Sequence, residues 1–121
     1  MSLEIFLDKP RALRLDMNAL SLFETATGRS ALDPSTWFAI RAGDITALVW
    51  AAITAHAQAP YYLQAKVPPD DLDVPTLSQL RAMIDASRLT ELREILDQAW
   101  GFFFPDADEG AEPDTENPPE A

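Results

Sequence analysis

The sequence predicts an α+β domain that is mostly α-helical, in which a short N-terminal β-hairpin packs on about four to five helices. Apolar and polar residues alternate twice near the N-terminus, which predicts two short strands. Farther along, apolar residues recur mainly at helical spacing. The chain has 121 residues, 47% of them hydrophobic, which suits one domain with a single core. We assign residues 1–104 to that domain and residues 105–121 to a disordered acidic C-terminal tail.

The N-terminal hairpin is predicted by two alternating runs joined at Pro10, whose fixed φ suits a turn. An isolated hairpin is only marginally stable in water, so we expect its apolar side to lie against a helix. The apolar positions of the two runs are Leu3, Ile5, Leu7, Leu13, Leu15 and Met17.

A first helix is predicted over residues 19–27. Asn18 precedes it as a candidate N-cap, and Gly28 follows it with the freedom to adopt the positive φ of a helix C-terminus. Its apolar positions recur at helical spacing and are Ala19, Leu22, Phe23 and Ala26.

A second, two-turn helix is predicted over residues 34–42. Asp33 can cap its N-terminus, and Pro34 suits the first helical position because the N–H it lacks has no partner there. Gly43 closes the pattern. We expect Trp37, within this helix, to be a core residue.

A third helix, residues 44–58, is predicted to be the centre of the fold. Asp44 is its expected N-cap, and Pro60 is expected to prevent much continuation beyond residue 58. Both of its faces are apolar, so little of it can contact water, and Trp50 should belong to the core. At roughly 22 Å it is too short, and at Thr46, Thr54 and His56 too polar, for a bilayer span.

The last helical region follows an extended connection rich in proline. Thr76 and Gln79 have the spacing of a capping box, which predicts a helix start at residue 77. Ser87 is a second possible cap, and we expect a break there between two helices. The amphipathic pattern ends at Gly101.

The net charge of −11 is concentrated at the C-terminus. From Asp106 onward the sequence has seven acids and no base, which leaves thirteen acids and nine bases, or about −4, for the rest. Such a segment has too little apolar surface to offset its ordering entropy, so it is predicted to be disordered. Because no basic stripe exists, nucleic-acid binding is disfavoured.

Catalytic and metal-binding patterns are missing from the sequence. It has no cysteine, which excludes thiolate catalysis and disulfides, and one histidine, His56, with Ala52 and Pro60 one turn away where a second ligand would be needed. Asp70, Asp71 and Asp73 lack the glycine and glutamate of a calcium loop, so we interpret them as a solvated acidic loop. We therefore predict no enzyme activity and no cofactor or metal. Without a secretory signal pattern, we expect an intracellular soluble protein.

Four aromatic residues at the end of the last helix are the candidate protein interface. Trp100, Phe102, Phe103 and Phe104 border the predicted disordered tail, where a small domain has little cover for them. Two interpretations remain open: they dock on a partner or another copy of the chain, or they pack on the domain's own core.

Two motifs resemble those of the tail assembly chaperones of long-tailed bacteriophages, prophages and gene-transfer agents. The likeness spans roughly residues 3 to 100 and pairs an N-terminal NAL…E..TG motif with a downstream LVWAA helix. The residues that carry it are Arg14, Leu15, Asn18, Ala19, Leu20, Glu24, Thr27 and Gly28, then Leu48, Trp50, Ala51, Ala52 and His56.

The resemblance implies a non-catalytic function in the bacterial cytoplasm. Such chaperones bind the long, largely helical tape-measure protein, keep it soluble, help recruit tail tube subunits and are absent from the finished virion. Self-association into a homo-oligomer is compatible with this role. The alternative, drawn from charge alone, is a regulatory or inhibitor module whose acidic C-terminal tail engages a basic protein partner.

Overall fold

The computed structural model of the chain describes residues 3–100, and for residues 99 and 100 it describes the backbone alone. The predicted disordered segment 105–121 and the predicted interface residues Phe102, Phe103 and Phe104 lie outside this range. The elements are β1 (Leu3–Phe6), β2 (Pro10–Leu13), α1 (Met17–Thr27), α2 (Pro34–Phe38), α3 (Ala42–Tyr62), α4 (Leu77–Met83), the 3₁₀ helix η1 (Ala86–Arg88) and α5 (Leu89–Trp100). The predicted α+β, mostly helical class is thus confirmed.

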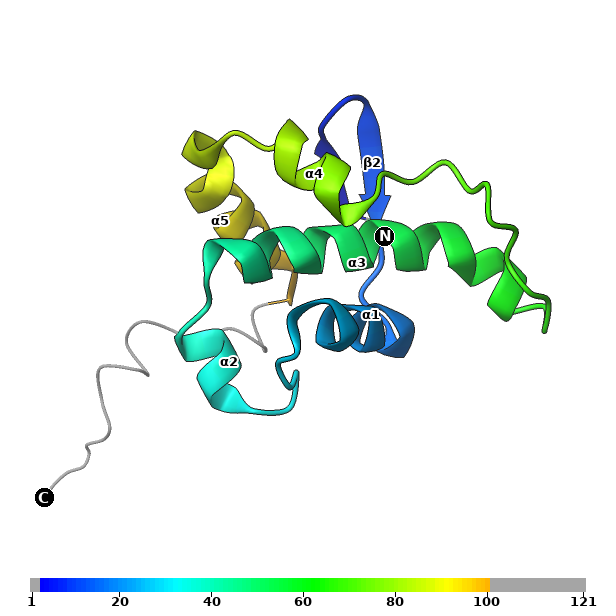
Figure 1. The fold of residues 1–121 in the computed structure, drawn as a ribbon, viewed down its shortest axis with the longest axis horizontal. Coiled ribbons are helices and arrows are strands. Elements are labelled where there is room, and N and C mark those ends of the chain that lie inside the picture. Colours follow the sequence, from blue (N-terminus) through cyan, green and yellow to red (C-terminus); the bar gives the residue numbers. More distant parts are fainter. Residues whose placement is uncertain (1–2, 101–121) are drawn as a thin grey trace, which may run out of the picture.

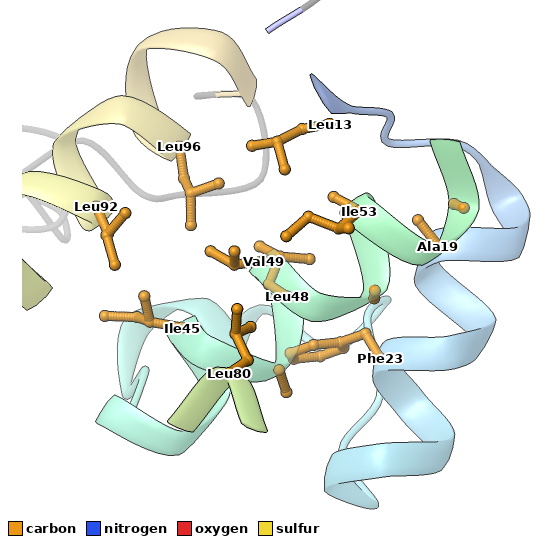
Figure 2. Packing of buried hydrophobic residues seen from close by; sticks show 14 of the residues in the cluster. Leu13, Ala19, Phe23, Ile45, Leu48, Val49, Ile53, Leu80, Leu92 and Leu96 are labelled. Carbon is orange, nitrogen blue, oxygen red and sulfur yellow. The ribbon is translucent and has the colours of Figure 1, made fainter. Parts of the chain in front are cut away.

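Helix α3 is the central element, as predicted. It crosses the middle of the molecule, with β2, α4 and α5 on one side and α1 and α2 on the other (Figure 1). Side chains from these elements converge on it, among them Leu13 of β2, Phe23 of α1, Leu80 of α4 and the pair Leu92 and Leu96 of α5 (Figure 2). Because α3 is covered on opposite sides, its residues are buried around most of its circumference.

The ends of α3 differ from the prediction. The helix begins at Ala42, with Arg41 as N-cap, and Asp44 lies in its first turn instead of capping it. The Asp44 carboxylate still acts as a cap, because it accepts the backbone N–H of Arg41 at 2.9 Å. The predicted N-cap was therefore three residues late.

The prediction that Pro60 ends α3 was wrong. Proline removes one backbone donor, but this affects only the carbonyl of His56, an exposed residue near the helix end. The next bond forms again, with the N–H of Leu63 donating to the carbonyl of Ala59 at 2.9 Å. The helix continues to Tyr62 with Pro60 inside it.

The hairpin packs on α3 as expected. Its antiparallel register places Leu3 opposite Leu13 and Ile5 opposite Arg11, and Ile5 and Leu13 are buried in the core. After β2, the N–H of Arg14 donates to the carbonyl of Ala52 in α3 at 3.1 Å.

Helix α1 has a different N-cap from the one predicted. Asp16 holds that position and accepts the N–H of Ala19 at 2.9 Å, so the helix begins at Met17. Asn18 lies within the first turn and instead donates to Gln58 of α3 at 2.7 Å. Gly28 ends the helix with φ of 71°, as predicted.

The remaining helices follow their local signals. Helix α2 is capped by Asp33 but ends at Phe38, earlier than predicted, because the backbone leaves helical geometry at Ala39. The capping box of α4 is confirmed, with Thr76 and Gln79 exchanging bonds of 2.9 and 3.1 Å. The predicted break is also found, between the end of α4 at Met83 and η1.

Candidate protein-interaction surface

Of the four predicted interface residues, only Trp100 lies in the described part of the chain. Trp100 is the last residue of α5, and only its backbone is described. Phe102, Phe103 and Phe104 lie beyond it, so their docking on a partner stays a prediction. The helix that leads to them is anchored, because Leu92 and Leu96 are buried against α3.

The other two tryptophans belong to the core. Trp37 is buried, and its ring stacks on that of Phe23 with centroids 5.2 Å apart and planes 21° apart. Its indole N–H donates to the carbonyl of Ala31 at 3.0 Å. Trp50 is half-buried and packs against the same core cluster. Neither is a main component of an exposed interface.

Three large exposed apolar side chains lie within six residues of one another where α3 ends. Tyr62, Leu63 and Val67 are 52%, 73% and 88% exposed, and Met17, at the start of α1, is 74% exposed. We call Tyr62, Leu63 and Val67 the α3-end surface. Three exposed apolar side chains grouped around one helix end are the kind of feature that marks a binding site.

The start of α1, where Met17 lies, packs on α3 one turn before Tyr62. The side chain of its neighbour Asn18 donates to that of Gln58, and Tyr62 lies one helical turn after Gln58 on the same side of α3. The start of α1 is thereby held beside the last turns of α3. Figure 1 shows that α3 extends well past α1 at this end, so its last turn projects from the body of the molecule.

A defined cap fixes the backbone of the projecting end. The N–H of Lys66 donates to the carbonyl of Tyr61 at 2.8 Å, and that of Ala65 to the carbonyl of Tyr62 at 3.0 Å. This is the hydrogen-bond pattern of a Schellman motif, in which the residue after the cap adopts a left-handed conformation. Ala65 does so with φ of 57°, although it is not glycine. The apolar side chains of the surface are therefore displayed on an ordered backbone.

The connection between α3 and α4 is acidic, and its end next to α4 is held by the hairpin. Residues 60–75 contain one base, Lys66, and three acids, Asp70, Asp71 and Asp73. The Asp73 carboxylate pairs with Lys9 of the hairpin turn. The backbone carbonyl of Asp73 accepts a hydrogen bond from the guanidinium of Arg11 at 2.8 Å. Asp70 and Asp71 are exposed, and in the described part of the chain neither makes an ion pair. They give this connection a local negative charge.

Arg11 is the buried centre of that anchor. Its guanidinium makes a bidentate pair with Asp8, at 3.1 and 2.8 Å, and its side chain is 9% exposed. The hydrogen bond from Arg11 lowers the pKa of Asp8, and the bond from Lys9, reinforced by Arg11, lowers the pKa of Asp73. The bond to Asp8 raises the pKa of Arg11, against the opposing effect of its burial.

A surface hollow of about 450 Å³ lies beside this ion cluster. It is lined by Asp8, Arg11, Asp73, Val74, Pro75, Gln79, Ala82 and Met83. Its charged groups already neutralise one another through the pairs described above. Its lining therefore offers no unpaired charge to orient a small ligand.

His56 is exposed near the C-terminal end of α3. Within residues 3–98, no three side chains of the types that ligate metals come together. None of the helices between residues 3 and 100 combines the length and hydropathy that a bilayer crossing requires. In comparisons with protein-family models, curated proteins and solved structures, nothing matches the chain.

Sequence reasoning missed the α3-end surface for a specific reason. It ended α3 at residue 58 and assigned Tyr62 and Leu63 to an extended loop. The available signal was the apolar run Tyr61-Tyr62-Leu63, which is unusual for a solvated connection. It could be interpreted only once the helix was known to pass through Pro60.

Proposed function

We propose that this chain is a non-catalytic tail assembly chaperone of a phage, prophage or gene-transfer agent, and that its client is the tape-measure protein. One observation carries the proposal: a small acidic domain displays Tyr62, Leu63 and Val67 to solvent on an ordered backbone. The sequence resemblance to this chaperone family supports the same function.

The chemistry of such a client fits the α3-end surface. A long, largely helical protein that is destined for the inside of a tube has apolar helix faces with no partner before the tube forms. Exposed tyrosine and aliphatic side chains can cover such a face, as helix-binding proteins do in general. A surface built from three side chains is small, so each contact would be weak and readily released.

The charge of the chain supports the second part of the role, which is to maintain solubility. The net charge of −11 makes copies bound along one client repel one another, which opposes aggregation. We place this activity in the cytoplasm of the bacterial host. Recruitment of the tail tube protein and self-association belong to the same proposal, with Trp100 and Phe102, Phe103 and Phe104 as a predicted second contact region.

A pull-down distinguishes this function from that of an acidic regulator. The full chain and a variant lacking residues 106–121 are each co-expressed with the tape-measure protein of the same genome and purified by a tag on the chain. The chaperone function predicts that both forms retain the client. Loss of the client on removal of residues 106–121 alone would instead favour the regulator, whose binding depends on that segment.

A double variant tests the aromatic residues. Trp100→Ala combined with Phe103→Ala is expected to weaken client retention while the domain stays folded, as judged by circular dichroism. Unchanged retention would remove these residues from the interface without affecting the rest of the proposal.

A further inference from the structure

We infer that the α3-end surface is a docking site for an amphipathic helix that carries one apolar face flanked by basic side chains. That the helix belongs to a tape-measure protein rests on the proposed function. The chemistry of the site itself rests on the residues of this surface.

The apolar part of the inference follows from which residues are exposed and how they are held. Tyr62 and Leu63 are consecutive residues of the projecting helix end, and Val67 follows just after the cap. Tyrosine has a large contact area and few rotatable bonds, so it loses little conformational entropy on binding. Because the cap already orders this backbone, a partner meets a preformed surface instead of a loop that must first be ordered.

The choice of a helix as the occupant follows from the elements that carry the site. Tyr62 is the last residue of α3, and Leu63 and Val67 follow it before α4, so the surface contains no strand edge. An extended peptide that adds to a sheet would need unpaired strand groups to bond, whereas an amphipathic helix can bind through the side chains of its apolar face.

The basic part of the inference follows from charge complementarity. Asp70 and Asp71 follow Val67 by three and four residues in the sequence. Both are exposed, and neither has an ion-pair partner among the described residues. Lys66 is the single base in residues 60–75. An incoming helix with basic flanks gains attraction from both carboxylates, whereas an acidic one is repelled. The overall net charge of −11 acts in the same direction at longer range.

The test uses the full chain and two synthetic helical peptides. Each peptide is about 18 residues long, or roughly 27 Å as a helix, with leucines along one face. One carries lysines on its flanks and the other glutamates. Binding is measured by fluorescence anisotropy at about 0.15 M salt, where long-range attraction is mostly screened. Leu63→Ser with Val67→Ser removes the apolar contact, and Asp70→Asn with Asp71→Asn removes the charge.

The matched control lies on the other side of the molecule. Leu32 lies just before α2, and Phe38 is the last residue of α2. Their exposed fractions, 88% and 62%, are comparable to those of Leu63 and Val67, the residues changed in the test variant. Leu32→Ser with Phe38→Ser therefore removes a similar amount of exposed apolar surface away from the proposed site. Circular dichroism and urea unfolding check that every variant is folded.

The inference predicts that the lysine peptide binds and the glutamate peptide does not. The Leu63/Val67 variant should bind the lysine peptide roughly tenfold or more weakly, because two buried aliphatic contacts are lost. The Asp70/Asp71 variant should bind a few-fold more weakly with a reduced salt dependence, and the control within about twofold of the unmodified chain. Equal binding by the Leu63/Val67 variant, or an equal loss in the control, would overturn the inference.

A parallel pull-down separates failure of this site from failure of the proposed function. If the tape-measure protein is retained equally by the unmodified chain and the Leu63/Val67 variant, the chaperone function stands and this docking site is wrong. If no tape-measure protein is retained at all, the proposed function fails, while the peptide measurements still decide the site. If sedimentation shows that these residues instead join two copies of the chain and no peptide binds, the inference is overturned.

Discussion

The guanidinium of Arg29 contacts the carboxylate of Asp44, joining the loop before α2 to the first turn of α3. Asp44 is 5% exposed and Arg29 is 17% exposed. The same guanidinium donates to the carbonyl of Ala39 at 3.2 Å, and Asp44 also accepts the N–H of Arg41. One buried ion pair thus holds both connections of the short helix α2.

Asp44→Asn should destabilise the fold. The change leaves the half-buried guanidinium of Arg29 without its counter-charge and weakens the cap at Arg41, so we expect a loss of roughly 2 to 3 kcal/mol in the free energy of unfolding. Urea denaturation measures it. The control is Asp97→Asn, an exposed acid, which should change stability by less than about 0.5 kcal/mol. Equal stability of both variants would show that the buried pair contributes little.

Ala65→Gly should stabilise the projecting end of α3. A left-handed residue with a Cβ is strained, and glycine removes that strain at some cost in unfolded-state entropy, so we expect a gain of roughly 0.5 to 1 kcal/mol. The reciprocal change is Gly28→Ala, where φ is 71° and an added Cβ would meet no atom within 4 Å. It should destabilise by a similar amount. A loss of stability in Ala65→Gly would contradict the assigned cap.

Thr54→Val should stabilise the domain. The hydroxyl of Thr54 is buried and has no hydrogen-bond partner, and valine has nearly the same shape without that polar group. Because the desolvation penalty is removed, we expect the free energy of unfolding to rise by about 1 kcal/mol, as measured by thermal or urea unfolding. Thr46→Val is the matched control, because the buried Thr46 hydroxyl donates to the carbonyl of Gly43 at 3.0 Å. If both variants gained stability, the missing partner at Thr54 would not be the cause.

Acidification should weaken the anchor around Arg11. The folded-state pKa values of Asp8 and Asp73 lie below their ordinary value of 3.8, because Arg11 and Lys9 bond to the charged carboxylates. Their contribution to stability is therefore complete above about pH 4 and is lost as pH falls through the lowered pKa values.

The measurement is the free energy of unfolding of the unmodified chain between pH 7 and about pH 2.5, compared with Asp8→Asn and Asp73→Asn. Each variant should lose less stability on acidification than the unmodified chain does. The exposed Asp70→Asn serves as control and should follow the unmodified chain. Parallel curves for all four proteins would contradict the role of the two pairs.

Local signals in the sequence predicted the elements whose geometry is set within a few residues. Thr76 and Gln79 cap α4 as expected, and Gly28 ends α1 in a left-handed conformation. The uniformly apolar segment around Leu48 was correctly placed at the centre, because such a helix can be stable only when surrounded.

Predictions failed where two plausible groups competed for one role. Asp16 and Asn18 are both good caps, and the packing of Asn18 on Gln58 selects Asp16 for the capping position. Pro60 was treated as a helix terminator, but its missing donor falls near the helix end, where the following turn can still form. The candidate site depends on that last turn, so it could not be predicted from the sequence.

The most direct test of the proposed function is the fraction of tape-measure protein that stays soluble when it is expressed in bacteria with and without this chain. The chaperone function predicts that the client is mostly insoluble alone, becomes soluble on co-expression, and elutes with the chain on size-exclusion chromatography. If the chain is folded and the client stays insoluble with no complex formed, the proposal is wrong.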